Sequence, residues 1–469
     1  MQRKTYLAKN TALFAINSIG TRLITFLLVP LYTKVFVTAE YGGVDLVTTI
    51  ATIFVPIITI NIGEAVMRFS LDEDADSKNI INIGILFSCL SIALGTTVFL
   101  VLRLFPQISA NPGIIYLFCI SQGIYQTMSC ILRGQEKLLH YAVGNIIATF
   151  SAAIMNIVFL VILKLGINGY FLAYTLSFVL GSIYCAIKSH ALSAVSFRNI
   201  DHDLLKKMVK YSIVLVPNSL MWWVMNSSDH IMVTGMIGIA ANGIYAISYK
   251  IPSILSSLST VFNQAWAYSA IHEDKSKDKV EFHNTMYDKL VRFQLIITII
   301  LMCIIRPLMK IYVDSAYFEA WKYTPYLLTG YFFLTMGTFL STFYTVNKDS
   351  RGFLFSGSAG AIINIVLNWI LIPYIGIHGA ALATCVSYIC VFLYRVRDTR
   401  KYIKVAVFKK EYVIGYIILL VSAVSMFLSE VVGQSILIAN TIVIMILYRS
   451  FIMECISICR KVINKLIRK

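Results

Sequence analysis

Nine long apolar stretches of this sequence contain no aspartate, glutamate, lysine or arginine: 81–102, 104–131, 141–163, 165–187, 323–347, 352–377, 379–394, 412–429 and 431–448. A helix needs about 20 mostly apolar residues to cross a bilayer. The stretches are continuously apolar rather than alternating, so they predict membrane-spanning helices and not a β-barrel. Hydrophobic residues make up 58% of the chain and charged residues 13%, whereas a soluble domain has about 25% charged residues. This balance excludes a coiled coil, a disordered chain, a collagen and a secreted disulfide scaffold.

Segments that carry one or two buried charges raise the expected number of helices. We predict an all-α polytopic membrane protein with 14 transmembrane helices, arranged as two parallel six-helix lobes plus two C-terminal helices. The expected helices lie near residues 10–35, 44–66, 81–103, 113–132, 140–163, 168–188, 211–236, 241–270, 287–306, 322–346, 353–374, 378–395, 412–429 and 432–450.

The basic residues set the predicted orientation. With the N-terminus inside, 32 of the 40 lysines and arginines fall in cytoplasmic segments, six fall outside, and Arg22 and Lys250 lie within the membrane. Both termini are therefore expected in the cytoplasm, at the inner (cytoplasmic) cell membrane, with the basic segment 451–469 on its surface. The net charge of +17 is then mostly loop charge facing anionic lipids. No loop is long enough to form a nucleic-acid-binding domain, so membrane lipids and not nucleic acid are the expected partners.

The sequence shows no sign of a resident cofactor, metal or catalytic centre. Nine cysteines and seven histidines have no paired metal-ligand spacing. A nucleotide-binding motif is also lacking, and the expected outer loops are short and hold few acidic residues. We therefore expect a protein that is not an enzyme and binds no cofactor or metal, with coupling to H⁺ or Na⁺ left open.

The two halves of the sequence repeat each other. Lys9 precedes Gly42 by 33 residues, and Lys210 precedes Gly243 by the same 33 residues. Residues 165–173 read LGINGYFLA and match residues 375–383, which read IGIHGAALA, at an offset of 210. We predict an N-lobe at 1–200, a C-lobe at 201–400, and two further helices with a basic amphipathic tail at 401–469. Parallel lobes predict a substrate path between them and transport by alternating access; a duplication without transport is the alternative.

Several charges are expected deep in the membrane. Arg22 is placed about 18–20 Å from either end of the first helix, where an arginine costs at least ~2.5–3.5 kcal/mol on insertion scales. Arg22 and Lys250 are therefore predicted to be cavity cations that bind substrate. Alternatively, Lys250 forms a structural ion pair with Asp229 across a helical hairpin. Glu64 and Asp45 are poor partners for Arg22 because they lie near opposite ends of the second helix. Asp229 and Asp45 are predicted as coupling carboxylates or ion-pair partners.

Glu64, Arg68 and Arg133 are expected together near the cytoplasmic ends of the second and fourth helices. They are predicted to form a cytoplasmic gate or a phosphate-capturing rim, because the planar arginine fork can bond phosphate oxygens in pairs. Ordinary interfacial charge at helix ends is the alternative.

Polar and aromatic residues also gather in particular helices. Amides and tryptophans suit a wet, sugar-binding cleft, although hydrogen bonds between helices explain any single one of them equally well. The sugar-facing candidates are Asn218, Trp222, Gln264 and Trp266.

The sequence resembles a known family of transporters. Residues 9–10, 30–33, 40–42 and 132–134 are similar to the signature of polysaccharide repeat-unit (oligosaccharide) flippases, which belong to the multidrug/oligosaccharidyl-lipid/polysaccharide exporter superfamily. The most specific stretch is 217–273, with Pro217-Asn218, Ser228-Asp229, Lys250-Ile251-Pro252 and Phe262 to Trp266. His230 departs from the family, whose members commonly have arginine there, so the charge at this position would depend on pH.

The resemblance implies a cargo and a route. The cargo would be an oligosaccharide on undecaprenyl pyrophosphate, turned from the inner to the outer leaflet to supply a capsule, O-antigen or teichoic-acid-type polymer. The polymerase and glycosyltransferases of that pathway would be partners. Three alternatives stay open at this stage: a peptidoglycan-precursor (lipid II-type) flippase, a cation or drug antiporter of the same superfamily, and a membrane polymerase.

Overall fold

The computed structural model describes residues 20–72, 75–102, 104, 106, 108–195, 200–273, 278–347 and 349–467. These residues are nearly all helical, and no strand occurs among them. The chain divides into two compact units. Unit 1 comprises Met1–Ala246 and Val313–Tyr317, and unit 2 comprises Ile247–Tyr312 and Phe318–Lys469. The lobe boundaries expected at residues 200 and 400 stay a prediction.

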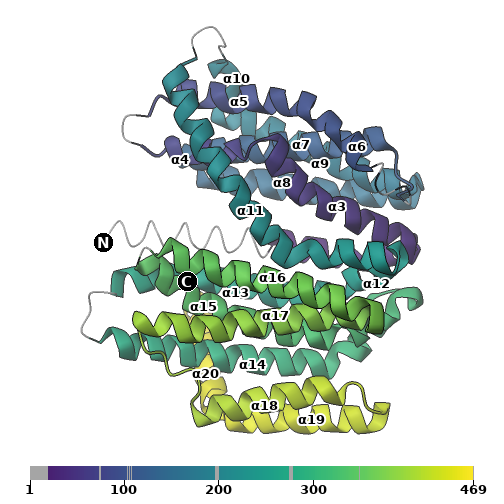
Figure 1. Cartoon of the computed structure of the whole chain (residues 1–469), viewed down its shortest axis with the longest axis vertical. Coiled ribbons are helices and arrows are strands. Elements are labelled where there is room, and N and C mark those ends of the chain that lie inside the picture. The colour runs from purple at the N-terminus through teal and green to yellow at the C-terminus, as the bar shows by residue number, and fades with distance from the viewer. Residues whose placement is uncertain are drawn as a thin grey trace. The chain divides into compact units, whose positions relative to one another are not determined.

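Unit 1 is a bundle in which α7, α8 and α9 run side by side (Figure 1). Its helices are α2 (Val29–Val35), α3 (Thr38–Ile58), α4 (Ile62–Phe69), α5 (Ser77–Leu94), α6 (Val98–Leu102), α7 (Pro112–Gly134), α8 (Leu138–Asn156), α9 (Gly166–Ser189), α10 (Ala191–Ala194), α11 (His202–Met236) and most of α12 (Ile239–Ser248). A π-helical turn, Ile157–Ile162, continues α8.

Unit 2 has α15 packed against α13, α14 and α17, and α16 packed along α17. Its helices are α13 (Lys250–Glu273), α14 (Lys279–Tyr312), α15 (Thr324–Val346), α16 (Ser350–Ile375), α17 (Ile377–Asp398), α18 (Lys410–Ser425), α19 (Glu430–Leu447) and α20 (Arg449–Ile467).

Nine helical segments of the described chain are long and apolar enough to cross a membrane. They correspond to nine of the fourteen expected spans. Of the other five, the span expected at 10–35 begins outside the described residues. The remaining four are the polar α11, the α12–α13 pair, α15 and the 16-residue α18. The multi-helical membrane fold is thus confirmed, while the number fourteen stays a prediction.

Capping explains where several helices depart from their expected bounds. The helix expected at 44–66 begins at Thr38, because the Glu40 carboxylate accepts a hydrogen bond from the Val37 backbone N–H at 3.2 Å. The helix expected at 211–236 begins at His202, because Asp201 accepts from two backbone N–H groups at its N-terminus. α11 is therefore one helix of 35 residues.

Two expected helices are interrupted. The span expected at 44–66 breaks at Ile60 and Asn61, whose φ angles of 52° and 55° are left-handed, so α4 starts as a separate helix. The span expected at 241–270 breaks at Tyr249, between α12 and α13. Both breaks put backbone polar groups at membrane depth, and such groups persist only where protein or water surrounds them.

The two glycines that the repeat aligns pack against each other. A Cβ atom at Gly42 would lie 1.8 Å from the carbonyl oxygen of Ile239, and one at Gly243 would lie 2.0 Å from that of Thr38. The partners Thr38 and Ile239 are separated by the same 201 residues as the glycines. This reciprocity is the pattern of a two-fold interface, so the starts of α3 and α12 are related as two copies of one element.

Candidate functional site

A cavity of about 330 Å³ lies inside unit 1, among the residues before α2 and those of α7, α8 and α9. Arg22 is exposed and contributes the charge to its described lining. The remaining polar lining residues are Thr21, Thr25, Tyr125, Tyr141, Asn145, Thr149, Tyr174 and Ser177. This volume falls at the lower end of the range for small-molecule sites, and the lining offers a cation, hydroxyls, an amide and aromatic faces.

A second cavity of about 260 Å³ lies at the turn between α3 and α4, facing α7 and α8. Its lining includes Glu64 and Arg133. The Arg133 guanidinium lies 4.0 Å from the Glu64 carboxylate and 5.7 Å from the centre of the Tyr141 ring. Both charged side chains are partly exposed, so this ion pair is loose and open to the cavity.

Tyr125, Tyr141 and Asn145 line both cavities. The Tyr125 hydroxyl donates a hydrogen bond to the side-chain oxygen of Asn145, which joins α7 to α8. The two cavities therefore adjoin at this bond, with Arg22 on one side and the Glu64–Arg133 pair on the other.

The break between α3 and α4 places Glu64. α4 begins at Ile62, so Glu64 lies in its first turn, where a carboxylate is favoured by the helix dipole. Gly63 lets α4 approach α7 closely, because a Cβ atom there would lie 3.2 Å from the Cys130 sulfur. This close packing puts Glu64 beside the Arg133 end of α7.

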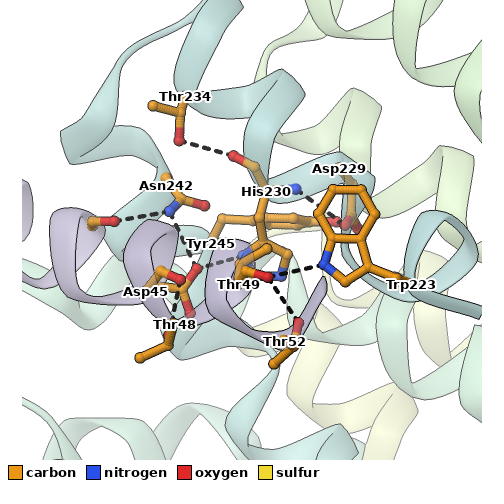
Figure 2. A network of polar contacts seen from close by, with 11 residues as sticks. Asp45, Thr48, Thr49, Thr52, Trp223, Asp229, His230, Thr234, Asn242 and Tyr245 are labelled. Carbon is orange, nitrogen blue, oxygen red and sulfur yellow. Dashed lines mark hydrogen bonds and ion pairs between the residues drawn. The ribbon is translucent and has the colours of Figure 1, made fainter. Parts of the chain in front are cut away.

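A buried polar network connects α3 with α11 and α12 (Figure 2). The His230 ring Nδ1 lies 2.7 Å from a carboxylate oxygen of Asp45. The side-chain N–H of Asn242 donates to the same carboxylate at 3.2 Å and to the Gly42 carbonyl oxygen at 3.1 Å. One carboxylate on α3 thus binds a side chain from each of the other two helices.

Asp229 extends this network. Its carboxylate accepts a hydrogen bond from the Tyr245 hydroxyl at 2.7 Å and another from the His230 backbone N–H at 3.1 Å. The Trp223 indole N–H donates to the Thr49 carbonyl oxygen at 2.9 Å, which makes a second contact between α11 and α3. Figure 2 shows these side chains converging from the three helices.

The structure separates the predicted cytoplasmic cluster into two parts. Glu64 and Arg133 come together, whereas the Arg68 guanidinium donates to Asp72 on the exposed side of α4 at 2.5 Å. Asp72 lies three residues beyond the end of α4, where the chain turns, and its carboxylate is within reach of the Arg68 guanidinium. The gate role predicted for the three residues stays a prediction, but Arg68 is absent from the described linings of both cavities.

The other predicted residues lie in several places. Lys250 is partly buried at the start of α13 in unit 2. Trp266 is 3% exposed, with its ring stacked on Phe339 at a centroid distance of 4.2 Å and an interplanar angle of 13°. A sugar could reach that ring face only if Phe339 moved. The side chains of Asn218, Trp222 and Gln264 lie outside the described part of the structure.

The sequence analysis missed much of the cavity lining and of the network. Tyr125, Asn145 and Tyr174 were not singled out, although an asparagine inside a charge-free stretch is a signal of an interior polar position. Asn242 was noted at the start of the second repeat and in the family signature, but no contact was predicted for it. Its partner Gly42 lies 200 residues earlier, and the repeat alignment could have paired the two segments.

The described residues contain no group of three or more metal-binding side chains. The linings of the two cavities in unit 1 supply cations, hydroxyls, amides, aromatic rings, the Glu64 carboxylate and the Cys130 thiol. Such linings can bind a polar or anionic molecule.

Comparisons with known proteins agree with this picture. The family model of a polysaccharide biosynthesis protein matches residues 7–268. A search of curated proteins gave no match.

Solved structures of MOP superfamily transporters share the fold. The lipid II flippase MurJ in an inward closed conformation matches with a TM-score of 0.67 and 16% identity, over 94% of this chain and 100% of that one. An inward-facing multidrug resistance MATE family transporter matches with a TM-score of 0.66 and 12% identity, over 82% and 97%. A MOP superfamily transporter from Pyrococcus furiosus, described by a binding pocket of reverse polarity, matches with a TM-score of 0.58 and 14% identity, over 84% and 95%.

Proposed function

This chain belongs to the polysaccharide biosynthesis protein family, and from that premise we propose that it flips undecaprenyl-pyrophosphate-linked oligosaccharide repeat units from the inner to the outer leaflet of the cytoplasmic membrane. The product would feed a capsule, O-antigen or teichoic-acid-type polymer. Transport would proceed by alternating access. The polymerase and glycosyltransferases of the same pathway would then be its functional partners.

The position of Arg22 carries this proposal. The sequence predicts Arg22 deep in the membrane, where an arginine is costly, and its side chain lines an open cavity with hydroxyl and amide neighbours. A guanidinium in a low-dielectric site attracts a phosphate group strongly and can bond two of its oxygens at once. A diphosphate headgroup therefore suits this position better than a neutral or cationic molecule does.

The rest of the cavity suits sugars. Tyr125, Tyr141 and Tyr174 offer ring faces and hydroxyls, and Asn145 offers an amide. Glu64 and Arg133 in the adjoining cavity supply a loose ion pair that an incoming phosphate could open, which fits a gate or capture site. Lys250, at the start of α13, stays a proposed second substrate-binding cation. The lipid tail needs no polar partner and can stay in the bilayer.

Purified protein in liposomes tests the function. The liposomes carry a labelled undecaprenyl-pyrophosphate oligosaccharide, and its appearance in the opposite leaflet is measured by an added enzyme that modifies only exposed sugars. We expect Arg22→Ala to reduce the initial rate at least about tenfold, which corresponds to one lost charge-assisted contact of about 1.4 kcal/mol or more. Arg351→Ala, at an exposed position on α16, is the matched control and should keep the full rate.

A second candidate is the flipping of a peptidoglycan precursor of the lipid II type. The observation in its favour is the match to MurJ over 94% of this chain. Both lipids should therefore be offered to the same liposomes. Preference for the repeat-unit lipid supports the first candidate, preference for lipid II supports the second, and transport of neither overturns the proposed function. A cation or drug antiporter fits less well, because the charge in the described lining of the larger cavity is positive.

A further inference from the structure

A short segment between α14 and α15, which we call the strap, belongs to the other unit from its neighbours in the chain. The strap, Val313–Tyr317, is part of unit 1, whereas the residues on either side, Tyr312 and Phe318, are part of unit 2. Its last three residues also begin the 3₁₀-helix η4 (Ser315–Lys322), whose remainder belongs to unit 2. One helical element is thus divided between two compact units.

Tyr317 attaches the strap to unit 1. Its side chain is 0% exposed, and its hydroxyl donates a hydrogen bond to the Phe36 carbonyl oxygen at 2.9 Å. The Tyr317 ring packs edge-on against the Tyr41 ring, with centroids 5.9 Å apart. A buried ring whose hydroxyl has a partner contributes both apolar area and a fixed direction, so Tyr317 is the anchor of the strap.

A second contact lies near the start of the strap. The Asp314 backbone N–H donates to the Thr33 hydroxyl at 3.2 Å, and Thr33 is 2% exposed. The Asp314 carboxylate accepts from the Ala316 N–H at 3.1 Å, which fixes the turn into η4. Both Thr33 and Phe36 belong to α2 or follow it directly. The strap is therefore seated on this end of α2 at two points.

The seat of Tyr317 is one end of an aromatic cluster. The Tyr41 ring lies 6.4 Å from that of Tyr32, which lies 5.3 Å from that of Tyr170. Tyr170 in turn lies 4.8 Å from Tyr174, a residue that lines the larger cavity. The strap thus completes one end of a packed cluster whose other end faces the proposed cargo.

Transport puts a demand on the strap. The distribution of basic residues predicts both the strap and the start of α3 on the outer side of the membrane. Alternating access opens that side by moving one half of the protein against the other. Because η4 is one helix, Tyr317 cannot stay in its seat while the rest of η4 moves with unit 2. Either Tyr317 leaves the seat or η4 must break.

We propose that the strap is a latch of the outer side: Tyr317 is seated in unit 1 while that side is closed and leaves unit 1 when it opens. One buried ring and two hydrogen bonds are few enough contacts to be broken and remade in each cycle. The role in transport rests on the proposed function. The seating of Tyr317 does not depend on any cargo and can be measured without one.

The first test measures how often the strap leaves its seat. Thr33→Cys places a thiol beneath the strap, and the full-length protein in lipid nanodiscs is treated with a maleimide. Mass spectrometry follows the label on the peptide that contains residue 33, which separates it from the nine native cysteines. We expect Tyr317→Ala to raise the labelling rate at least about tenfold, since the buried ring is lost. Tyr317→Phe keeps the ring and should raise it about threefold, the effect of one hydrogen bond.

Tyr448→Ala is the matched control for general loosening of the protein. Tyr448 is also 0% exposed, and its hydroxyl also donates to a backbone carbonyl oxygen, that of Glu411, at 3.0 Å. It lies in unit 2 and does not touch the strap, so the labelling rate at residue 33 should stay unchanged. Equal labelling in Tyr317→Ala and in the unsubstituted background would overturn the latch, and so would an equal rise in Tyr448→Ala.

The second test asks whether transport needs the strap to leave. Thr33→Cys and Asp314→Cys are combined and oxidised to hold the strap in its seat, and flipping is measured in the liposome assay before and after reduction. The matched control is Gly144→Cys. A Cβ atom at residue 144 would lie 2.9 Å from the native Cys185 sulfur, so its disulfide joins α8 to α9 within unit 1 and leaves the strap unconstrained.

We expect the linked strap to reduce flipping at least about tenfold and a reductant to restore it, while the linked control keeps the full rate. Undiminished flipping by protein whose strap is fully linked, as quantified by mass spectrometry, would overturn the latch. The proposed function fails separately: if no offered lipid is flipped before oxidation, that function is removed, and the labelling at residue 33 alone decides whether Tyr317 holds the strap in place.

Discussion

By the predicted repeat, helices α7, α8 and α9 in unit 1 correspond to helices α15, α16 and α17 in unit 2, but the polar side chains of the two sets differ in their surroundings. In unit 1, Tyr125 and Asn145 stand at the border of two cavities. In unit 2, Asn364 donates to Thr384 at 3.2 Å, and Asn368 donates to Asn364 at 2.9 Å. The hydrogen-bonded pair of unit 1 thus lines open space, whereas the hydrogen-bonded asparagines of unit 2 are buried in packed protein.

The arginines follow the same division. Arg22 is exposed and lines a cavity, whereas Arg395 is 1% exposed. Arg395 donates to the Ser356 hydroxyl at 3.1 Å and to the Gly337 carbonyl oxygen at 3.0 Å, and so connects α17 to α16 and α15. The predicted repeats can therefore serve binding in one copy and rigidity in the other, and the difference lies in whether the arginine lines a cavity or is buried in packed protein.

The largest expected effect comes from Arg395. Replacing it by alanine leaves a void in the packed interior of unit 2 and removes both hydrogen bonds. We expect Arg395→Ala to lower the free energy of unfolding by about 3 kcal/mol, measured by thermal or denaturant unfolding in detergent. Arg22→Ala, with its side chain at an open cavity, should change stability by less than about 0.5 kcal/mol. Equal losses in the two variants would break the comparison.

Substitutions at the glycine contact test whether Gly42 and Gly243 contribute equally to stability. Gly42→Ala and Gly243→Ala each place a Cβ atom within 2.0 Å of a backbone oxygen, so the helices must move apart. We expect each to cost about 2–3 kcal/mol, in equal measure because the contact is reciprocal. Gly43→Ala is the matched control, since its nearest new neighbour would be at 3.5 Å. A large loss in the control, or a loss in only one of the pair, would contradict the two-fold relation.

Asn364 in unit 2 and Asn145 in unit 1 give a further test of the difference between the two units. Asn364→Ala removes the centre of the unit 2 network, and we expect it to cost about 1 kcal/mol of stability, as interhelical hydrogen bonds in membranes do. Asn145→Ala should cost less stability but slow flipping, because its side chain lines both cavities. Unfolding midpoints and flipping rates of the two variants are compared side by side. If Asn145→Ala left flipping untouched while Asn364→Ala slowed it, the assignment of roles would be reversed.

The smallest expected effect concerns two helix caps outside the membrane spans. Hydrogen bonds from the Tyr402 hydroxyl and the Gly352 N–H lower the pKa of Asp349 to about 2, and bonds from the Asn79 side chain and backbone lower the pKa of Asp76. A lowered folded-state pKa means that the ionised form stabilises the fold above about pH 4. This stability is lost as the pH falls toward 2.

Asp349→Asn should therefore lower the unfolding midpoint slightly at neutral pH, and the difference from the unmodified protein should shrink as the pH falls from about 4 toward 2. Asp76→Asn is the matching change in unit 1. Unfolding midpoints across this pH range measure both. A difference that stays constant with pH would show that the carboxylate charge is not what stabilises these caps.

Much of this fold can be read from the sequence, because lipid allows so few solutions for a charge-free stretch. The apolar segments of α7, α8, α9, α16 and α17 were expected within a few residues. The repeat aligned Gly42 with Gly243, but it did not predict the contact between α3 and α12. The roles of Arg22 and His230 stay predictions. These signals are local, or they recur at a fixed spacing.

The rest depends on which side chains face each other across helices. Periodicity could not tell that Arg68 turns to Asp72 while Arg133 approaches Glu64, since all four lie near the same helix ends. The partnership between Asp45 and His230 joins residues 185 positions apart. Trp266 was expected to face sugar because of its chemistry, but shape complementarity with Phe339 buries it. Distances of this kind are fixed by packing rather than by composition.

The unbroken length of α11 has a mechanical consequence. A helix of 35 residues is about 52 Å long, and it joins exposed lysines near His202 to the Asp229–His230 end. A tilt of about 10° at one end displaces the other by about 9 Å. Pro217 has no backbone N–H and so removes one hydrogen bond within α11. The helix therefore bends most easily at this residue. A bend at Pro217 would therefore change the position of one end of α11 relative to the other.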